Sequence, residues 1–215
     1  MTADRDAGWT VERRSGSAAE LHALEWPDPL VPTVWAMDVD GPALVLGSTQ
    51  PASSVDTAAL ARDGIVLARR RSGGGAVLVD PGTTVWIDVF IPRDDPRWVD
   101  DVGRSFLWLG RAWQRALDDL GVAAEVHDGP LVCGAFGRQV CFAAVGSGEL
   151  TANGAKVVGL SQRRTRAGAR LQCTAYRRWD AAPMAALGLD PASLPPVRPL
   201  EAPRSDIEAA LVAHL

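Results

Sequence analysis

The chain of 215 residues lacks any long apolar run and contains few cysteines and histidines. No segment approaches the roughly 20 apolar residues that a membrane-spanning helix requires. Residues 1–14 are charged and polar where a secretory signal would be apolar. The cysteines, Cys133, Cys141 and Cys173, show no CxxC spacing, which argues against a disulfide framework and a zinc site. We therefore expect a cytoplasmic protein with no membrane partner.

An excess of positive charge is also missing, because 26 acidic residues outnumber 22 lysines and arginines and give a formal net charge of −4. Nothing in this balance would draw the chain to nucleic acid. The three histidines form no HxxxH or HExxH pair, so no metal site is expected. Lysine itself is nearly absent, since Lys156 is the only one. It is either a chance survivor in an arginine-rich chain or a residue kept because a compact ammonium must point at one oxygen.

Short apolar segments separated by turn sequences predict a fold made mostly of strands. The clearest helix is predicted over about 98–120, where apolar residues recur at spacings of three and four. Shorter helices are predicted at 55–62 and 205–214, with Ser205 as the N-cap of the last. Asn153-Gly154 predicts a hairpin turn. The predicted strands cover 33–39, 43–47, 65–69, 76–79, 84–91, 122–126, 139–144, 149–151, 155–160, 161–166 and 169–174.

This order of elements indicates an α+β fold with a mixed, largely antiparallel sheet and flanking helices. No linker-like stretch interrupts the middle of the chain, so one domain is predicted over residues 31–182. Residues 1–30 would form an N-terminal extension packed on that domain. Residues 183–215 would form a C-terminal tail with a short helix and no accessory domain.

Two segments carry residues suited to chemistry. In the first, Arg69–Arg71 and Ser72 lead into Gly73–Gly75, a loop whose backbone can approach a ligand closely while the arginines pair with phosphate or carboxylate. The segment lacks the Lys-Ser/Thr of a P-loop, and a solvated flexible turn is equally consistent with it. The second segment places Lys156 just after the Asn-Gly turn, with Gly159 permitting close backbone approach or marking a bulge.

Taken together, RRRSGGGAV at 69–77 and GAKVVGLSQ at 154–162 resemble the lipoate-protein ligase A and octanoyltransferase families. The resemblance covers about 31–176, and it includes Leu46-Gly47-Ser48-Thr49-Gln50 and the helix near 98–120. It implies the catalytic-domain fold of the biotin and lipoyl ligases, which is related to class II aminoacyl-tRNA synthetases. A biotin ligase fits less well, because the RRxSGGGAV form resembles the lipoate side of the family.

The resemblance also implies an activity, the transfer of a lipoyl or octanoyl group to a lysine of a lipoyl carrier domain or a glycine-cleavage-type carrier protein. An acyl carrier protein could be the donor. No tightly bound cofactor is implied, although ATP and magnesium would be substrates of a ligase. Lys156, expected to face solvent, would hydrogen-bond the acyl carbonyl. The residues implied to bind substrate are Arg70, Ser72, Gly73, Gly74, Gly75, Ala76, Gly159 and Ser161.

Cys141 bears on the choice between a ligase, which forms an acyl-adenylate, and a transferase, which passes the acyl group through a thiolate. Cys141-Phe142, Glu149-Leu150 and Lys156 resemble the CF…EL…K arrangement of cysteine-dependent octanoyltransferases. Cys141 would then attack the thioester. A buried, inert strand cysteine is the alternative interpretation. Cys173 is a second candidate nucleophile, ranked below Cys141.

The chain departs from the family in four places. Gln172-Cys173 stands where His-Gly is common, no N-terminal helix is evident in 17–26, no accessory domain follows Tyr176, and 146–148 looks like an insertion. The missing accessory domain favours a transferase over an ATP-dependent ligase. The altered Gln172-Cys173 site keeps open a third alternative, a protein that binds lipoate or a lipoyl domain without catalysis.

Overall fold

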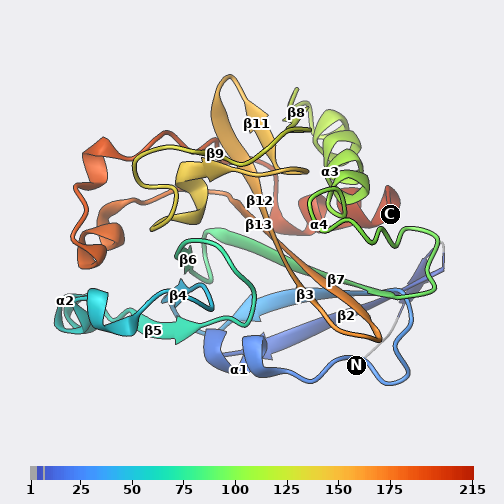
Figure 1. The fold of residues 1–215 in the computed structure, drawn as a ribbon, viewed down its shortest axis with the longest axis horizontal. Coiled ribbons are helices and arrows are strands. Elements are labelled where there is room, and N and C mark those ends of the chain that lie inside the picture. The colour runs from blue at the N-terminus through green and yellow to red at the C-terminus, as the bar shows by residue number, and fades with distance from the viewer. Residues whose placement is uncertain (1–3, 7) are drawn as a thin grey trace.

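The computed structural model describes residues 4–6 and 8–215, and its framework is a large and a small β-sheet (Figure 1). Among the described strands of the large sheet, β2 and β3 pair in parallel and all other neighbours pair antiparallel. The predicted α+β class and the mixed, largely antiparallel sheet are therefore confirmed. In order across the sheet, its strands are β1 (Asp4–Asp6), β2 (Trp9–Gly16), β3 (Thr33–Val39), β7 (Thr84–Pro92), β13 (Gly168–Tyr176), β12 (Ala155–Arg164), β11 (Leu150–Ala152) and β8 (Glu125–Val126).

The small sheet places β4 (Ala43–Leu46) between β5 (Val66–Arg69) and β6 (Val77–Val79). The small sheet lies beside the short helix α2 (Thr57–Arg62) (Figure 1). Strands β9 (Val132–Cys133) and β10 (Ala144–Val145) form a separate two-stranded antiparallel sheet. The described residues also form four 3₁₀ helices: η1 (Ala52–Ser54), η2 (Cys141–Ala143), η3 (Ala182–Leu187) and η4 (Pro191–Ser193).

Both faces of the large sheet are covered. On one face, α3 (Leu107–Asp119) and α4 (Arg204–Ala213) pack side by side (Figure 1). Trp113 and Leu117 of α3 are buried in the core between these helices and the sheet. On the other face, α1 (Ala18–Ala23) and the small sheet enclose a second core. The alternation along β7 explains both cores, because successive side chains of a strand point to opposite faces. Val85, Ile87, Val89 and Ile91 face the helices, whereas Trp86 and Phe90 face the small sheet.

The Asn153-Gly154 hairpin is confirmed. Both residues have positive φ, 52° and 76°, as a type I′ turn requires, and they connect the antiparallel strands β11 and β12. Strands β12 and β13 also pair antiparallel and form a second hairpin. None of the helices in the described part of the chain has both the length and the apolar character needed to cross a membrane.

Several predicted boundaries are wrong. The helix predicted over 98–120 begins only at Leu107, because Asp101 accepts from the Gly103 amide and holds the preceding residues in turns. Instead of a strand, residues 139–144 hold η2, preceded by a single bridge between Val140 and Ala76. The last helix begins at Arg204 after Pro203, so Ser205 is not its N-cap.

The N-terminal helix missed in 17–26 is present as α1. Its signal was the capping box, in which the Ser17 hydroxyl accepts from the Glu20 amide and the Glu20 carboxylate accepts from the Ser17 amide. Strand β2, which precedes α1, was also missed, because its partly exposed side chains alternate only weakly. The division into 1–30, 31–182 and 183–215 remains a prediction.

Candidate functional site

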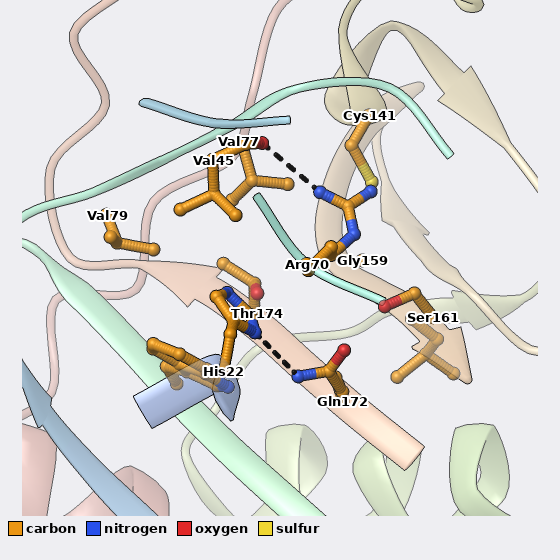
Figure 2. A pocket seen from close by; sticks show the side chains of 12 residues that line it. His22, Val45, Arg70, Val77, Val79, Cys141, Gly159, Ser161, Gln172 and Thr174 are labelled. Carbon is orange, nitrogen blue, oxygen red and sulfur yellow. Dashed lines mark hydrogen bonds between the residues drawn. The ribbon is translucent and has the colours of Figure 1, made fainter. Parts of the chain in front are cut away.

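Two neighbouring cavities meet at Cys141 and Leu160. The inner cavity has a volume of about 20 Å³, enough for about one water. Its apolar wall is formed by Val45, Val77, Val79 and Trp86, and its other lining residues are His22, Arg70, Cys141, Gly159, Leu160, Ser161, Gln172 and Thr174 (Figure 2). The outer cavity is about 390 Å³, the size of a small-molecule site. It is bordered by the Gly73–Gly75 loop, Lys156, Glu149 and the 146–147 turn.

The buried side chain of Arg70, only 4% exposed, holds the glycine loop in place from the protein interior. The guanidinium donates to the carbonyls of Gly73 and Gly75 at 2.8 Å and of Val45 at 3.3 Å. Burial lowers the pKa of Arg70, an effect that nearby Cys141 and Tyr176 oppose. The resemblance implied that Arg70 binds substrate, whereas here its guanidinium is buried and donates to three backbone carbonyls.

The loop also requires glycine for packing. A Cβ at Gly75 would lie 2.6 Å from the Val140 carbonyl carbon, so a side chain would push the loop off the segment that carries Cys141. Within the described residues, no amide N–H of Gly73, Gly74 or Gly75 donates to a protein acceptor. These three groups therefore remain free to donate to a ligand oxygen. Ala76, by contrast, lines neither cavity and pairs through its backbone with Gln139 and Cys141.

A polar chain crosses the inner cavity. The Ser72 hydroxyl lies 2.7 Å from the Gln172 amide oxygen and 3.1 Å from the Ser161 hydroxyl. The Gln172 amide nitrogen lies 3.3 Å from His22 Nδ1, as the dashed line in Figure 2 shows. If that amide donates, Nδ1 accepts and the imidazole proton lies on Nε2. An imidazole thus reaches the inner cavity from α1 and meets Gln172 there.

His22 and its surroundings were not predicted as part of the site. Burial, followed by the charges of Arg170 and Arg70, lowers the pKa of His22 well below its usual value, so the ring is neutral near pH 7. The ring packs on Trp86 with centroids 4.3 Å apart. Behind it, buried Asp88 accepts from Arg170 at 2.6 Å, and Arg170 in turn donates to the Leu21 carbonyl of α1. Recognising the capping box of α1 would have placed His22 on a buried helix face.

Lys156 is buried, with 3% exposure, so the expectation that it faces solvent is wrong. Its ammonium donates to Glu149 Oε2 at 2.7 Å and to the carbonyls of Cys141 and Ala144 at 2.8 and 2.9 Å. The carboxylate of Glu149 compensates the buried charge, which would otherwise be costly. Gly159 fits the close-approach interpretation, because a Cβ there would lie 3.1 Å from the Phe142 ring.

The two candidate nucleophiles differ sharply in environment. Cys141 is half-buried, borders both cavities, and places Sγ 3.9 Å from Lys156 Nζ. Figure 2 shows it beside the Arg70 guanidinium. Cys173 points into the core beneath α3, and burial raises the pKa of its thiol to about 12. A thiol that stays protonated is not a nucleophile near neutral pH, so Cys173 is excluded.

Of the remaining predicted residues, Ser161 and Gly159 line the inner cavity and Gly73–Gly75 border the outer one. Ser72 lines neither cavity but hydrogen-bonds to two lining residues of the inner one, Ser161 and Gln172. Across residues 4–6 and 8–215, no three His, Cys, Asp or Glu side chains gather in a way that could hold a metal ion. The groups available for chemistry at the site are the Cys141 thiol, the cations of Lys156 and Arg70, and the free backbone N–H groups of Gly73–Gly75, beside an apolar pocket.

The fold and the site define an α+β domain in which two adjoining cavities are bordered by a glycine loop, a cysteine and a buried lysine. Residues 20–193 match the family model of the lipoyl protein ligase A/B catalytic domain. This match covers most of the chain, which belongs to that family. The predicted family resemblance is thereby confirmed.

Individual relatives agree with this assignment. The chain is 33% identical over 129 residues to octanoyltransferase LipM of Moorella thermoacetica, a match that covers 57% of this chain and 45% of that protein. The chain thus spans less than half the length of this relative. Among solved structures, protein Ta0514 of T. acidophilum with bound lipoic acid has a TM-score of 0.72 at 19% identity, covering 94% of this chain and 81% of that one.

A lipoate-protein ligase A bound with ATP has a TM-score of 0.68 at 18% identity, covering 96% of this chain and 82% of that one. At these identities the solved structures show a shared fold.

Proposed function

We propose that this chain is an acyltransferase that moves an octanoyl or lipoyl group from a carrier thioester to a lysine of a lipoyl carrier domain. The observation that carries the proposal is the position of Cys141, whose Sγ lies 3.9 Å from Lys156 Nζ at the junction of the two cavities. Membership of the family and the partial similarity to an octanoyltransferase support it.

In the first half-reaction the Cys141 thiolate attacks the thioester carbonyl carbon and forms a new carbon–sulfur bond. The tetrahedral oxyanion collapses and breaks the bond to the carrier sulfur, which leaves as a thiolate and takes up a proton. In the second, the acceptor lysine amine attacks the acyl-Cys141, forms an amide, loses a proton and releases the Cys141 thiolate. The free N–H groups of Gly73–Gly75 and the positive charge of Lys156 would stabilise each oxyanion.

The inner cavity would receive the acyl chain, because its wall of three valines and Trp86 is apolar. Its 20 Å³ is too small as it stands, since even benzene fits a cavity of about 150 Å³. Side chains must therefore move apart when the acyl chain enters. The outer cavity is large enough for the thioester arm of a donor or the lysine arm of an acceptor.

An ATP-dependent lipoate-protein ligase is the second candidate. It is favoured by the outer cavity beside three free loop N–H groups, an arrangement that can bind phosphate oxygens. Because the Arg70 donors already bind carbonyls, an adenylate would need another cation, and magnesium would then accompany ATP as substrate.

Intact-mass spectrometry separates these functions. The protein and an apo lipoyl domain are incubated either with octanoyl-carrier thioester or with lipoate, ATP and magnesium. We expect the lipoyl domain to gain an octanoyl mass from the thioester alone, with an acyl adduct on Cys141. Cys141→Ser should slow this transfer at least about a hundredfold. A gain only with ATP would establish the ligase, and no gain in either mixture would favour the non-catalytic binder.

A further inference from the structure

Glu149 is buried with 5% exposure, and three donors fix its carboxylate. Oε2 accepts from Lys156 Nζ at 2.7 Å and from the Gly146 amide at 2.7 Å. Oε1 accepts from the Leu160 amide at 2.8 Å. The carboxylate is therefore held between the turn before β11 and the middle of β12, and it has one orientation available.

Four acceptors share the three N–H groups of the Lys156 ammonium. Glu149 Oε2 and the carbonyls of Cys141 and Ala144 lie at 2.7, 2.8 and 2.9 Å, and the Cys141 sulfur lies at 3.9 Å. The contact with the sulfur is therefore the longest of the four, and Lys156 acts on the thiol mainly through its positive charge. Its hydrogen bond to the Cys141 carbonyl also fixes the backbone that carries the thiol.

The charges around the sulfur are nearly balanced. Lys156 and Arg70 supply two cations, Glu149 supplies one anion, and a thiolate would bring the cluster to neutrality. Two other titratable groups, His22 in the inner cavity and Tyr176, which interacts electrostatically with Cys141, contribute no charge near neutral pH. Tyr176 has its pKa raised well above the usual value by burial, and the pKa of His22 is lowered by burial.

We propose that Glu149 is a positioning residue of the acyl-transfer site, which holds the Lys156 ammonium beside Cys141 and sets how readily the thiol ionises. The predicted effect of Glu149 on turnover rests on the proposed function, whereas its effect on the ionisation of the thiol does not. No contact joins Glu149 to the cysteine itself among the described residues, so Glu149 acts through Lys156.

The test measures the rate of Cys141 alkylation by iodoacetamide against pH, by peptide mass spectrometry in a Cys133→Ser background. Glu149→Gln keeps the size of the side chain and removes its negative charge, so the cluster becomes more positive and the profile should move to lower pH. We expect alkylation at pH 6.5 to be about threefold faster. The matched control, Glu125→Gln at an exposed position of β8, should leave the profile unchanged.

A double-mutant cycle checks that the effect passes through Lys156. In the Lys156→Met background the unpaired buried carboxyl would be neutral, so adding Glu149→Gln should change nothing. An equal shift with and without Lys156, or no shift at all, overturns the proposal. If Glu149→Gln does not fold, Glu149→Asp keeps the charge and should retain a near-normal profile while transfer slows.

The kinetic readout separates this inference from the proposed function. Glu149→Gln should lower kcat for thioester transfer about tenfold or more and leave KM for the carrier unchanged. If the normal protein transfers no acyl group but the alkylation cycle behaves as stated, the proposed function fails and the positioning role stands. A normal kcat in Glu149→Gln overturns the positioning role.

Discussion

At the scale of single residues, the site depends on cations whose donors are already engaged. Arg70 binds two carbonyls of the glycine loop, and Lys156 binds Glu149 and two carbonyls. Both residues act by shaping the backbone and by charge. Arginine suits the first task because its planar fork serves several carbonyls at once, whereas a lysine points a compact charge at one place.

His22 gives a pH prediction at this scale. Burial lowers its folded pKa below the ordinary value of 6.5, so the unfolded chain takes up a proton first as pH falls. Stability should therefore be intact above about pH 6.5 and be lost progressively below it. Urea unfolding midpoints at pH 7.5 and 5.5 measure this loss, which His22→Gln should reduce.

The unchanged protein must be compared with His22→Gln because Asp88 has the opposite effect on the pH dependence of stability. Burial raises the pKa of its carboxyl, which lessens the loss of stability in acid. Subtracting the profile of His22→Gln cancels that contribution. An identical loss between pH 7.5 and 5.5 in both proteins would show that His22 is not buried as a neutral ring.

At the scale of elements, local signals explain which segments could be predicted. The alternation in 84–91 and the Asn153-Gly154 turn each depend on a few neighbouring residues, and the structure confirms both. The strand predicted over 139–144 was wrong because Val140 and Phe142 are buried in clusters with residues distant in the sequence, such as Tyr176, which an alternating pattern does not reveal. Helix α1 was missed because six residues are too few for a periodic stripe.

The cap of α1 provides a prediction for this element. Ser17→Ala removes the side-chain half of the capping box and should lower the free energy of unfolding by about 1 kcal/mol. It should also speed hydrogen exchange of the amides in Ala18–Ala23, the helix that carries His22. Ser15→Ala, at an exposed position of β2, is the matched control and should change neither quantity. Unchanged exchange in Ser17→Ala would contradict the role of the cap.

At the scale of the whole molecule, the pocket exists only because two sheets meet. The small sheet brings Val45 and Val77, the large sheet brings Gly159 and Thr174, and α1 closes one side with His22. A ligand that enters between the sheets binds only the folded protein, so it must raise the apparent stability.

Octanoic acid provides the whole-molecule prediction. At ten times its Kd it should stabilise the fold by about 1.4 kcal/mol, measured as a rise in Tm. Val77→Phe adds volume where about one water fits, so it should abolish this rise. Val99→Phe, at a partly exposed surface position, should preserve it. A normal response in Val77→Phe would place the acid outside the inner cavity.

The sequence by itself determined the α+β class, most strands, the hairpin turn and the family, because backbone sterics and side-chain periodicity act over a few residues and the motifs occur in a fixed order. Only the tertiary structure decided that Lys156 is buried against Glu149, that Cys173 lies in the core while Cys141 faces the cavities, and that His22 meets Gln172, 150 positions away. These pairings depend on how the sheets pack, and burial in turn sets the protonation of His22 and Cys173.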